Sequence, residues 1–295
     1  MKKILVSLLI LLSTAATAAS RSDAAADLHR LFEATWQKEL AADPQMANYL
    51  GDNRYNDRWT DMSKEAITRR HQHDLDTLAA LQAIPRTGLG AADRLNYDLF
   101  EREYRQRLAV WRFKPHLYAI NHQGGIQTLS EITELLQFNS VRDYENWIAR
   151  LRAVGTLVDQ HIALLDEAAR EKRTQPRAIM QRIPLQLALQ NVPRPEDSPF
   201  YAPFLRFPDS IDVATRGRLS AAGRDAIAKT VLPAYARFTK AFEERTHGPQ
   251  DANLYRMKGD EHLTMRQARG DEVRQQLYCF LKVFLIEGDT TEPLR

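Results

Sequence analysis

The sequence has 295 residues, enough for one large domain or two small ones. Its content of 44% hydrophobic and 27% charged residues is ordinary for a globular protein with a sizeable core. The formal net charge of +3 falls to +1 without residues 1–18, because Lys2 and Lys3 are the only charged residues there. Such a nearly neutral chain is not expected to bind nucleic acid in general.

Residues 1–18 have the pattern of a secretory signal peptide. Two lysines precede an apolar run over residues 4–12, and Ala16 and Ala18 supply the small residues that a signal peptidase reads. The run is too short for a permanent membrane helix, and no cysteine follows it, so we expect no stable membrane anchor. We predict a periplasmic or secreted protein, cleaved near Ala18. Its single cysteine, Cys279, allows no internal disulfide.

The first part of the mature chain predicts three long helices. Apolar residues recur at three- and four-residue steps from Asp23 to Pro44, from an N-cap at Ser63 to about Ala83, and over residues 91–111. In the second and third helices the residues expected to face inward are Ile67, His71, Leu75, Leu78, Leu81, Leu95, Leu99, Phe100, Leu108 and Trp111.

A change of pattern follows near residues 116–128. The stretch "HLYAIN" alternates and leads into Gly124 and Gly125, which predicts a short extended segment. Ser130 is then placed to cap a short helix through Phe138.

The clearest helix begins at Ser140, where Asp143 occupies the acidic position of a capping box. Its apolar stripe is Val141, Tyr144, Ile148, Leu151, Val154, Val158, Ile162 and Leu165. Further helices are expected after Pro176, with a kink at Pro184, and over residues 209–244, with a division near Pro233. A proline-rich loop over residues 191–208 separates them. The predicted fold class is mainly α, a multi-helix array.

The histidines do not form a known catalytic pattern. A zinc peptidase helix needs H-E-x-x-H, and no histidine in this chain is followed by glutamate. His71 and His73 would point to nearly opposite sides of a helix, because each residue turns about 100°. His116 and His122 would lie roughly 20 Å apart in an extended segment. No G-x-S-x-G or G-x-G-x-x-G motif occurs, so we assign no catalytic residue and no metal ligand.

The stretch "NHQGGIQT" is the candidate binding segment. It contains His122, Gln123, Gly125 and Gln127. The three polar side chains can form hydrogen bonds with a peptide, and the glycine, which has no side chain, lets a peptide backbone approach closely. In this interpretation Gly124 serves a turn, while the other four residues line a cleft. The alternative is that the whole stretch is only a tight turn between two elements.

Four stretches, in order, resemble a bacterial domain-of-unknown-function family numbered 885. They are "DPQMANYLGDNRYNDRWTDMS", "YAINHQGGIQT", "DYENWIARLRAV" and "SPFYAPF" followed by "VLPAYARF", and they cover about residues 42–242. The resemblance implies an exported, mostly helical protein related to zinc peptidases with a gluzincin-like fold. It also implies that "NHQGG" forms part of a substrate cleft between two helical lobes.

The chain departs from that family in its second half. Full-length members are about twice as long and carry their H-E-x-x-H helix there, so no zinc ligand transfers to this sequence. We divide the chain into a signal peptide (1–18), an N-terminal helical part (19–246) and a divergent tail (247–295). The tail is interpreted as the end of a truncated or frameshifted gene product, or as an unusual extension.

Two functions follow from this interpretation. In the first, the chain is the N-terminal half of an exported zinc-metallopeptidase-like protein and is not catalytic alone. Zinc and a peptide substrate then belong to a protein completed by a C-terminal half. In the second, it is an all-α periplasmic module that binds a peptide or partner. A large exposed apolar surface would favour the first function.

Overall fold

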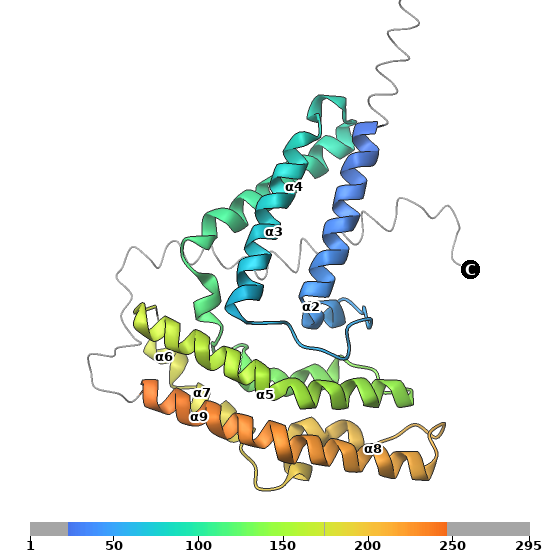
Figure 1. Cartoon of the computed structure of the whole chain (residues 1–295), viewed down its shortest axis with the longest axis vertical. Coiled ribbons are helices and arrows are strands. Elements are labelled where there is room, and N and C mark those ends of the chain that lie inside the picture. Colours follow the sequence, from blue (N-terminus) through green and yellow to red (C-terminus); the bar gives the residue numbers. More distant parts are fainter. Residues whose placement is uncertain (1–22, 174, 247–295) are drawn as a thin grey trace, which may run out of the picture.

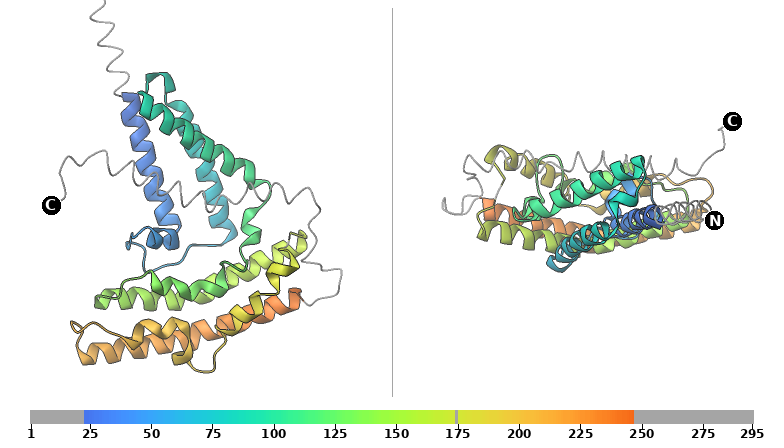
Figure 2. Two further views of the ribbon diagram at one scale, coloured as in Figure 1. Left: turned by 180° about the vertical axis from the view of Figure 1, so that it is seen from behind. Right: turned by 90° about the horizontal axis from the view of Figure 1, so that it is seen from above.

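The computed structural model describes residues 23–173 and 175–246, and these are helical almost throughout (Figure 1). An arm of helices stands on a base of long helices that run side by side (Figures 1 and 2). The predicted mainly α class is confirmed. The predicted signal peptide and tail lie outside the described residues. None of the helices in the described part combines the length and apolar character needed to cross a bilayer.

The arm is formed by the first helices of the chain. They are a helix over residues 23–42, α2 (Pro44–Tyr49), α3 (Lys64–Ala83), the 3-10 turn η1 (Arg86–Gly88) and α4 (Ala91–Trp111). Leu28 and Leu81 are fully buried in the cluster that joins these helices, together with Phe100. The prediction that Leu75 and Leu95 face inward is wrong, since they are 41% and 56% exposed.

The base is built around α5 (Val141–Arg170). Its other elements are α6 (Arg177–Met180), α7 (Ile183–Ala188), η4 (Pro195–Asp197), η5 (Pro199–Leu205), α8 (Val213–Ala226), η6 (Ile227–Val231) and α9 (Leu232–Thr246). The predicted capping box is confirmed: Ser140 Oγ accepts from the Asp143 N–H, and Asp143 Oδ2 accepts from the Ser140 N–H at 2.8 Å. The mid-stripe residues Leu151 and Val154 are completely buried.

Near the predicted division at Pro233 the structure has a change of helix geometry and not a break between two helices. The π-helical turn η6 ends just before this proline and joins α8 to α9. Proline has no N–H and its ring crowds the carbonyl four residues earlier, so the regular hydrogen-bond ladder cannot continue unchanged.

A buried arginine joins arm and base. The Arg150 side chain of α5 is 0% exposed, and its Nη2 donates to Asn48 Oδ1 at 2.6 Å and to the Tyr55 carbonyl at 3.2 Å. Its Nε donates to the Arg58 carbonyl at 2.9 Å, and the guanidinium lies over the Trp59 ring. Burial lowers the pKa of Arg150 to about 10. Arg150 therefore links α5 to the loop between α2 and α3, and Gln160 of α5 adds hydrogen bonds to Asp61 and Met62 of the same loop.

The segment between arm and base is less extended than the sequence suggested. Residues Pro115–Tyr118 form the 3-10 turn η2, and Ile126–Glu134 form the 3-10 helix η3. Among the described residues, β pairing is limited to an isolated bridge between Asn121 and Gly124. Pro115 favours a helical turn by fixing φ, and the buried residues Leu117 and Ile120 are three positions apart, as in a helical turn and not as in a strand.

Candidate functional site

The stretch singled out in the sequence forms a tight polar turn at the junction of arm and base. The Asn121 N–H donates to the Gly124 carbonyl at 3.1 Å, and the Gly124 N–H donates back at 3.3 Å. Asn121 Oδ1 also accepts from the Gln123 N–H at 2.8 Å. His122 and Gln123 therefore occupy the tip of the turn, where His122 is half-buried and Gln123 is exposed.

The two glycines have different roles. Gly125 has φ 141° and ψ −163°, a conformation that only glycine adopts readily. A β-carbon there would lie 2.7 Å from Gln127 Oε1 and 3.0 Å from the Ala119 carbonyl oxygen. At Gly124 nothing lies within 4 Å of an added β-carbon, and φ is not positive. The backbone conformation therefore requires glycine at position 125 and not at position 124. The sequence interpretation had instead assigned the turn to Gly124.

Gln127 holds the turn from the inside. Its side chain is buried, and its Nε2 donates to the Asn121 carbonyl at 2.7 Å and the Gly124 carbonyl at 3.2 Å. The structure thus brings the four predicted residues together but turns Gln127 away from the surface. Of the four, His122 and Gln123 lie where a ligand could touch a side chain.

Two further glutamines complete this arrangement, and the sequence interpretation missed both. Gln186 Nε2 donates to the His122 carbonyl at 3.0 Å, and Gln190 Nε2 donates to the Gln127 carbonyl at 3.1 Å. Tyr235 of α9 adds a 2.6 Å hydrogen bond from its hydroxyl to the Ile126 carbonyl. The i, i+4 spacing of glutamines in "QLALQ" was the available signal, since it places both amides on one helix face.

The amide oxygens of these glutamines are left as acceptors. The Oε1 atoms of Gln127, Gln186 and Gln190 are buried and meet no donor among the described residues. Each amide orientation is fixed because each nitrogen donates to a backbone carbonyl. The inner side of the turn consequently has more acceptors than donors.

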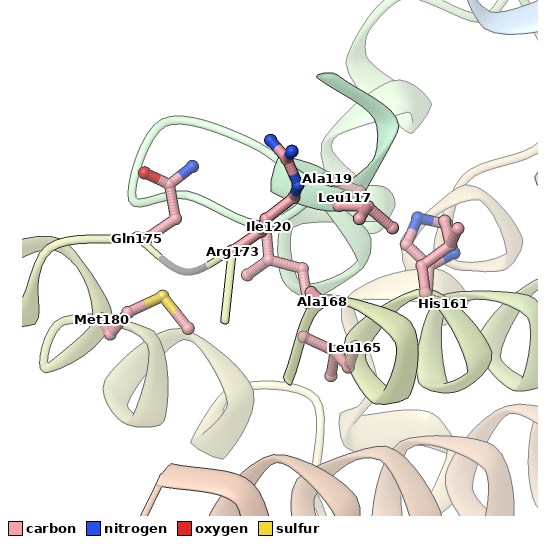
Figure 3. Close-up of a pocket in the computed structure, with 10 residues that line it drawn as sticks. Leu117, Ala119, Ile120, His161, Leu165, Ala168, Arg173, Gln175 and Met180 are labelled. Atoms are coloured by element: carbon pink, nitrogen blue, oxygen red, sulfur yellow. The ribbon is translucent and has the colours of Figure 1, made fainter. Parts of the chain in front are cut away.

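An apolar pocket is lined in part by Leu117, Ala119 and Ile120, which directly precede the turn (Figure 3). The pocket is narrow and partly open to solvent; the empty space in and around it amounts to about 330 Å³ only when the open part is included. Its lining residues are Leu117, Ala119, Ile120, His161, Leu164, Leu165, Ala168, Arg173, Gln175 and Met180. Arg173 and Gln175 lie on the side opposite Leu165 and Ala168 in the close-up. The pocket thus has an apolar floor and a polar rim.

The polar groups of the pocket are held by backbone oxygens. Arg173 Nη1 donates to the Phe113 carbonyl at 3.0 Å, and Gln175 Nε2 donates to the Tyr118 carbonyl at 3.5 Å. The His161 Nδ1–H donates to the Leu157 carbonyl at 2.9 Å. Burial of the His161 ring lowers its pKa, which keeps the ring uncharged at neutral pH. The lining of the pocket is therefore uncharged apart from Arg173.

His71, His73 and His116 contact neighbouring side chains. His71 stacks on Trp111 with ring centroids 3.9 Å apart, and His116 lies 5.3 Å from the same ring. His73 Nδ1 contacts Thr77 Oγ1 at 3.3 Å. Within residues 23–173 and 175–246, no three His, Cys, Asp or Glu side chains are grouped so that they could hold a metal ion. These residues do not fit a catalytic zinc site.

The comparisons with known proteins agree with this architecture. A family described as "Bacterial protein of unknown function (DUF885)" matches residues 44–275, and the chain belongs to that family. The match continues past residue 246, where the sequence interpretation expected divergence, into residues that the structure does not describe. A search among curated proteins found no significant match.

A similar fold occurs among solved structures. It is seen in the crystal structure of a "putative lipoprotein" from Colwellia psychrerythraea, with a TM-score of 0.66 and 16% sequence identity. The alignment covers 79% of this chain and 42% of that chain. This chain therefore spans less than half the length of that relative.

Proposed function

We propose that this chain is the peptide-binding helical lobe of an exported metallopeptidase-like protein, without a catalytic centre of its own. The observation that carries the proposal is the position of the pocket and the polar turn on one segment, residues 117–127. A pocket of this kind accepts one apolar side chain of an extended peptide. His122 and Gln123, at the tip of the adjacent turn, are placed to contact its backbone.

Membership of the family and the fold shared with part of a longer protein support the rest of the proposal. In the longer proteins that the sequence resembles, zinc would be held by a second lobe, which closes on the peptide. The signal-like residues 1–18 support export, and so does the description of the structural relative as a putative lipoprotein. For this chain we infer cleavage near Ala18 and release into the periplasm or the medium.

The experiment is a binding measurement on the mature chain, residues 19–295. Fluorescence anisotropy would be followed with labelled Gly-Leu-Gly-Gly and with labelled Gly-Glu-Gly-Gly. Burial of a leucine side chain contributes about 1.5–3 kcal/mol, so we expect the leucine peptide to bind at least about tenfold more tightly. Neither peptide should be cleaved, with or without added Zn²⁺.

Matched variants locate the binding. Ala168→Phe fills the floor of the pocket and should weaken binding of the leucine peptide at least about tenfold. Ala163→Phe, on the exposed side of the same helix, should leave binding unchanged. His122→Ala and Gln123→Ala should weaken binding without lowering the melting temperature.

Two outcomes would contradict the proposal. Equal affinity for both peptides, or equal affinity of the Ala168→Phe and Ala163→Phe variants, would show that the pocket is not a peptide site. Zinc-dependent cleavage by the purified chain would show that it has a catalytic centre. If the leucine peptide binds tightly without any second lobe, the chain is sufficient as a binding module, which was the alternative function.

A further inference from the structure

His161 brings a hydrogen-bond acceptor to the apolar pocket. It belongs to α5, is only 8% exposed and is one of the residues that line the pocket. Its Nδ1 atom lies 2.9 Å from the Leu157 carbonyl oxygen, one helical turn earlier. A carbonyl oxygen can only accept, so Nδ1 carries the proton of the neutral ring. Because burial lowers the pKa of His161, the ring stays neutral and Nε2 keeps its lone pair.

This second nitrogen faces the pocket. Leu157 precedes His161 in α5, whereas the pocket residues Leu165 and Ala168 follow it, so the two ring nitrogens point to different sides. Figure 3 shows one nitrogen of the His161 ring on the side of Leu117. Within residues 23–173 and 175–246, Nε2 has no hydrogen-bond partner. A ligand that carries a donor can therefore form a hydrogen bond here that a purely apolar ligand cannot.

The rest of the lining restricts the ligand to a short and otherwise apolar group. The pocket is narrow, and its buried apolar residues are Leu117, Ile120, Leu164, Leu165 and Ala168. Arg173, the charged residue of the lining, already donates to the Phe113 carbonyl and pairs with Glu171. The interior thus offers apolar carbon atoms and one imidazole nitrogen.

We propose that the pocket selects a threonine or serine side chain of the bound peptide, whose hydroxyl donates to His161 Nε2. Threonine matches both parts of the lining, because its hydroxyl meets the nitrogen while its methyl group meets the apolar residues. Valine has nearly the same shape but no donor, so it would leave Nε2 without a partner. This inference rests on the proposed function and narrows the class of peptide that the site takes.

Peptides of matched shape test the hydrogen bond without any change to the protein. Fluorescence anisotropy would compare labelled Gly-Thr-Gly-Gly with Gly-Val-Gly-Gly, and Gly-Ser-Gly-Gly with Gly-Ala-Gly-Gly, on the mature chain. Valine is the more hydrophobic residue and would bind more tightly in a pocket without an acceptor. We expect the threonine peptide to bind at least about fivefold more tightly than the valine peptide, and serine to be preferred over alanine. Equal affinities, or a preference for valine, would overturn the proposal.

A variant assigns the preference to this nitrogen. In His161→Leu the acceptor is replaced by an apolar group, so the order should reverse and the valine peptide should bind more tightly than the threonine peptide. His29→Leu is the matched control, because His29 is exposed and pairs with Asp93 in the arm. It should keep the parental preference for threonine. If His161→Leu also keeps that preference, the hydroxyl is bound elsewhere and the proposal is wrong.

Nitrogen-15 spectra of the histidine side chains provide a measurement that needs no variant. The Nε2 resonance of a neutral imidazole shifts when its lone pair accepts a hydrogen bond. Saturation with the threonine peptide should shift the His161 Nε2 signal, and saturation with the valine peptide should not shift it in that direction. Identical spectra with the two peptides would contradict the proposed hydrogen bond.

The outcomes distinguish this inference from the proposed function. If the leucine peptide binds and Ala168→Phe weakens it, but threonine and valine peptides bind equally, the pocket holds a peptide without using His161. Only the present inference then fails. If no peptide of either set binds, the proposed function and this inference fail together.

Discussion

Replacement of Gly125 by alanine tests the conformation of the junction turn most directly. The φ and ψ of Gly125 lie in a region that costs other residues about 1–3 kcal/mol. The new methyl group would also lie 2.7 Å from Gln127 Oε1 and 3.0 Å from the Ala119 carbonyl oxygen. If Gln127 moves away, it loses its two hydrogen bonds to the turn, at about 0.5–1.5 kcal/mol each. We therefore expect a loss of about 2–6 kcal/mol in the free energy of unfolding.

Gly124→Ala is the matched control. It adds the same methyl group one residue earlier, where no atom lies within 4 Å and φ is not positive. We expect its free energy of unfolding to lie within about 1 kcal/mol of the parent, because alanine restricts only the unfolded chain there.

Urea titrations of the two variants and the parent, followed by far-UV circular dichroism, would give the free energies. Comparable losses in both variants would refute the assignment of the glycine requirement to Gly125. A loss below about 0.5 kcal/mol for Gly125→Ala would show that the turn is not built as described.

Three further predictions concern the core, metal binding and pH. Leu151→Ala should lower the free energy of unfolding by about 2–5 kcal/mol, whereas Leu75→Ala, at an exposed site, should cost under about 1 kcal/mol in the same titration. Metal analysis of the dialysed mature chain should find well under one zinc ion per chain, and one tightly held ion would contradict the assignment of zinc to longer relatives alone. Burial lowers the pKa of His161, so the unfolded chain binds the proton more readily, and stability should fall as the pH drops below about 6.5. His161→Gln should reduce that fall, and identical acid titrations of variant and parent would refute the role of His161.

Much of the helical organisation was determined by the sequence itself. The capping box at Ser140 and the stripe through Leu151 depend on residues within a few positions of each other, so the pattern that predicts the helix is also what forms it. The change of helix geometry before Pro233 is equally local, because the ring acts on its own helix. The interruption at Gly124 and Gly125 was visible for the same reason.

Only the tertiary structure decided which side of each element is covered and which polar group meets which. Gln127 points inward because it donates to carbonyls of the junction turn. That turn also accepts a hydrogen bond from Gln186, which lies more than sixty residues after His122 in the sequence. Leu75 continued a regular apolar spacing but is 41% exposed. The spacing of apolar residues in the sequence indicates which face of a helix could be buried. Whether that face is buried depends on which other element packs against it in the folded protein, and that element is encoded in a different part of the sequence.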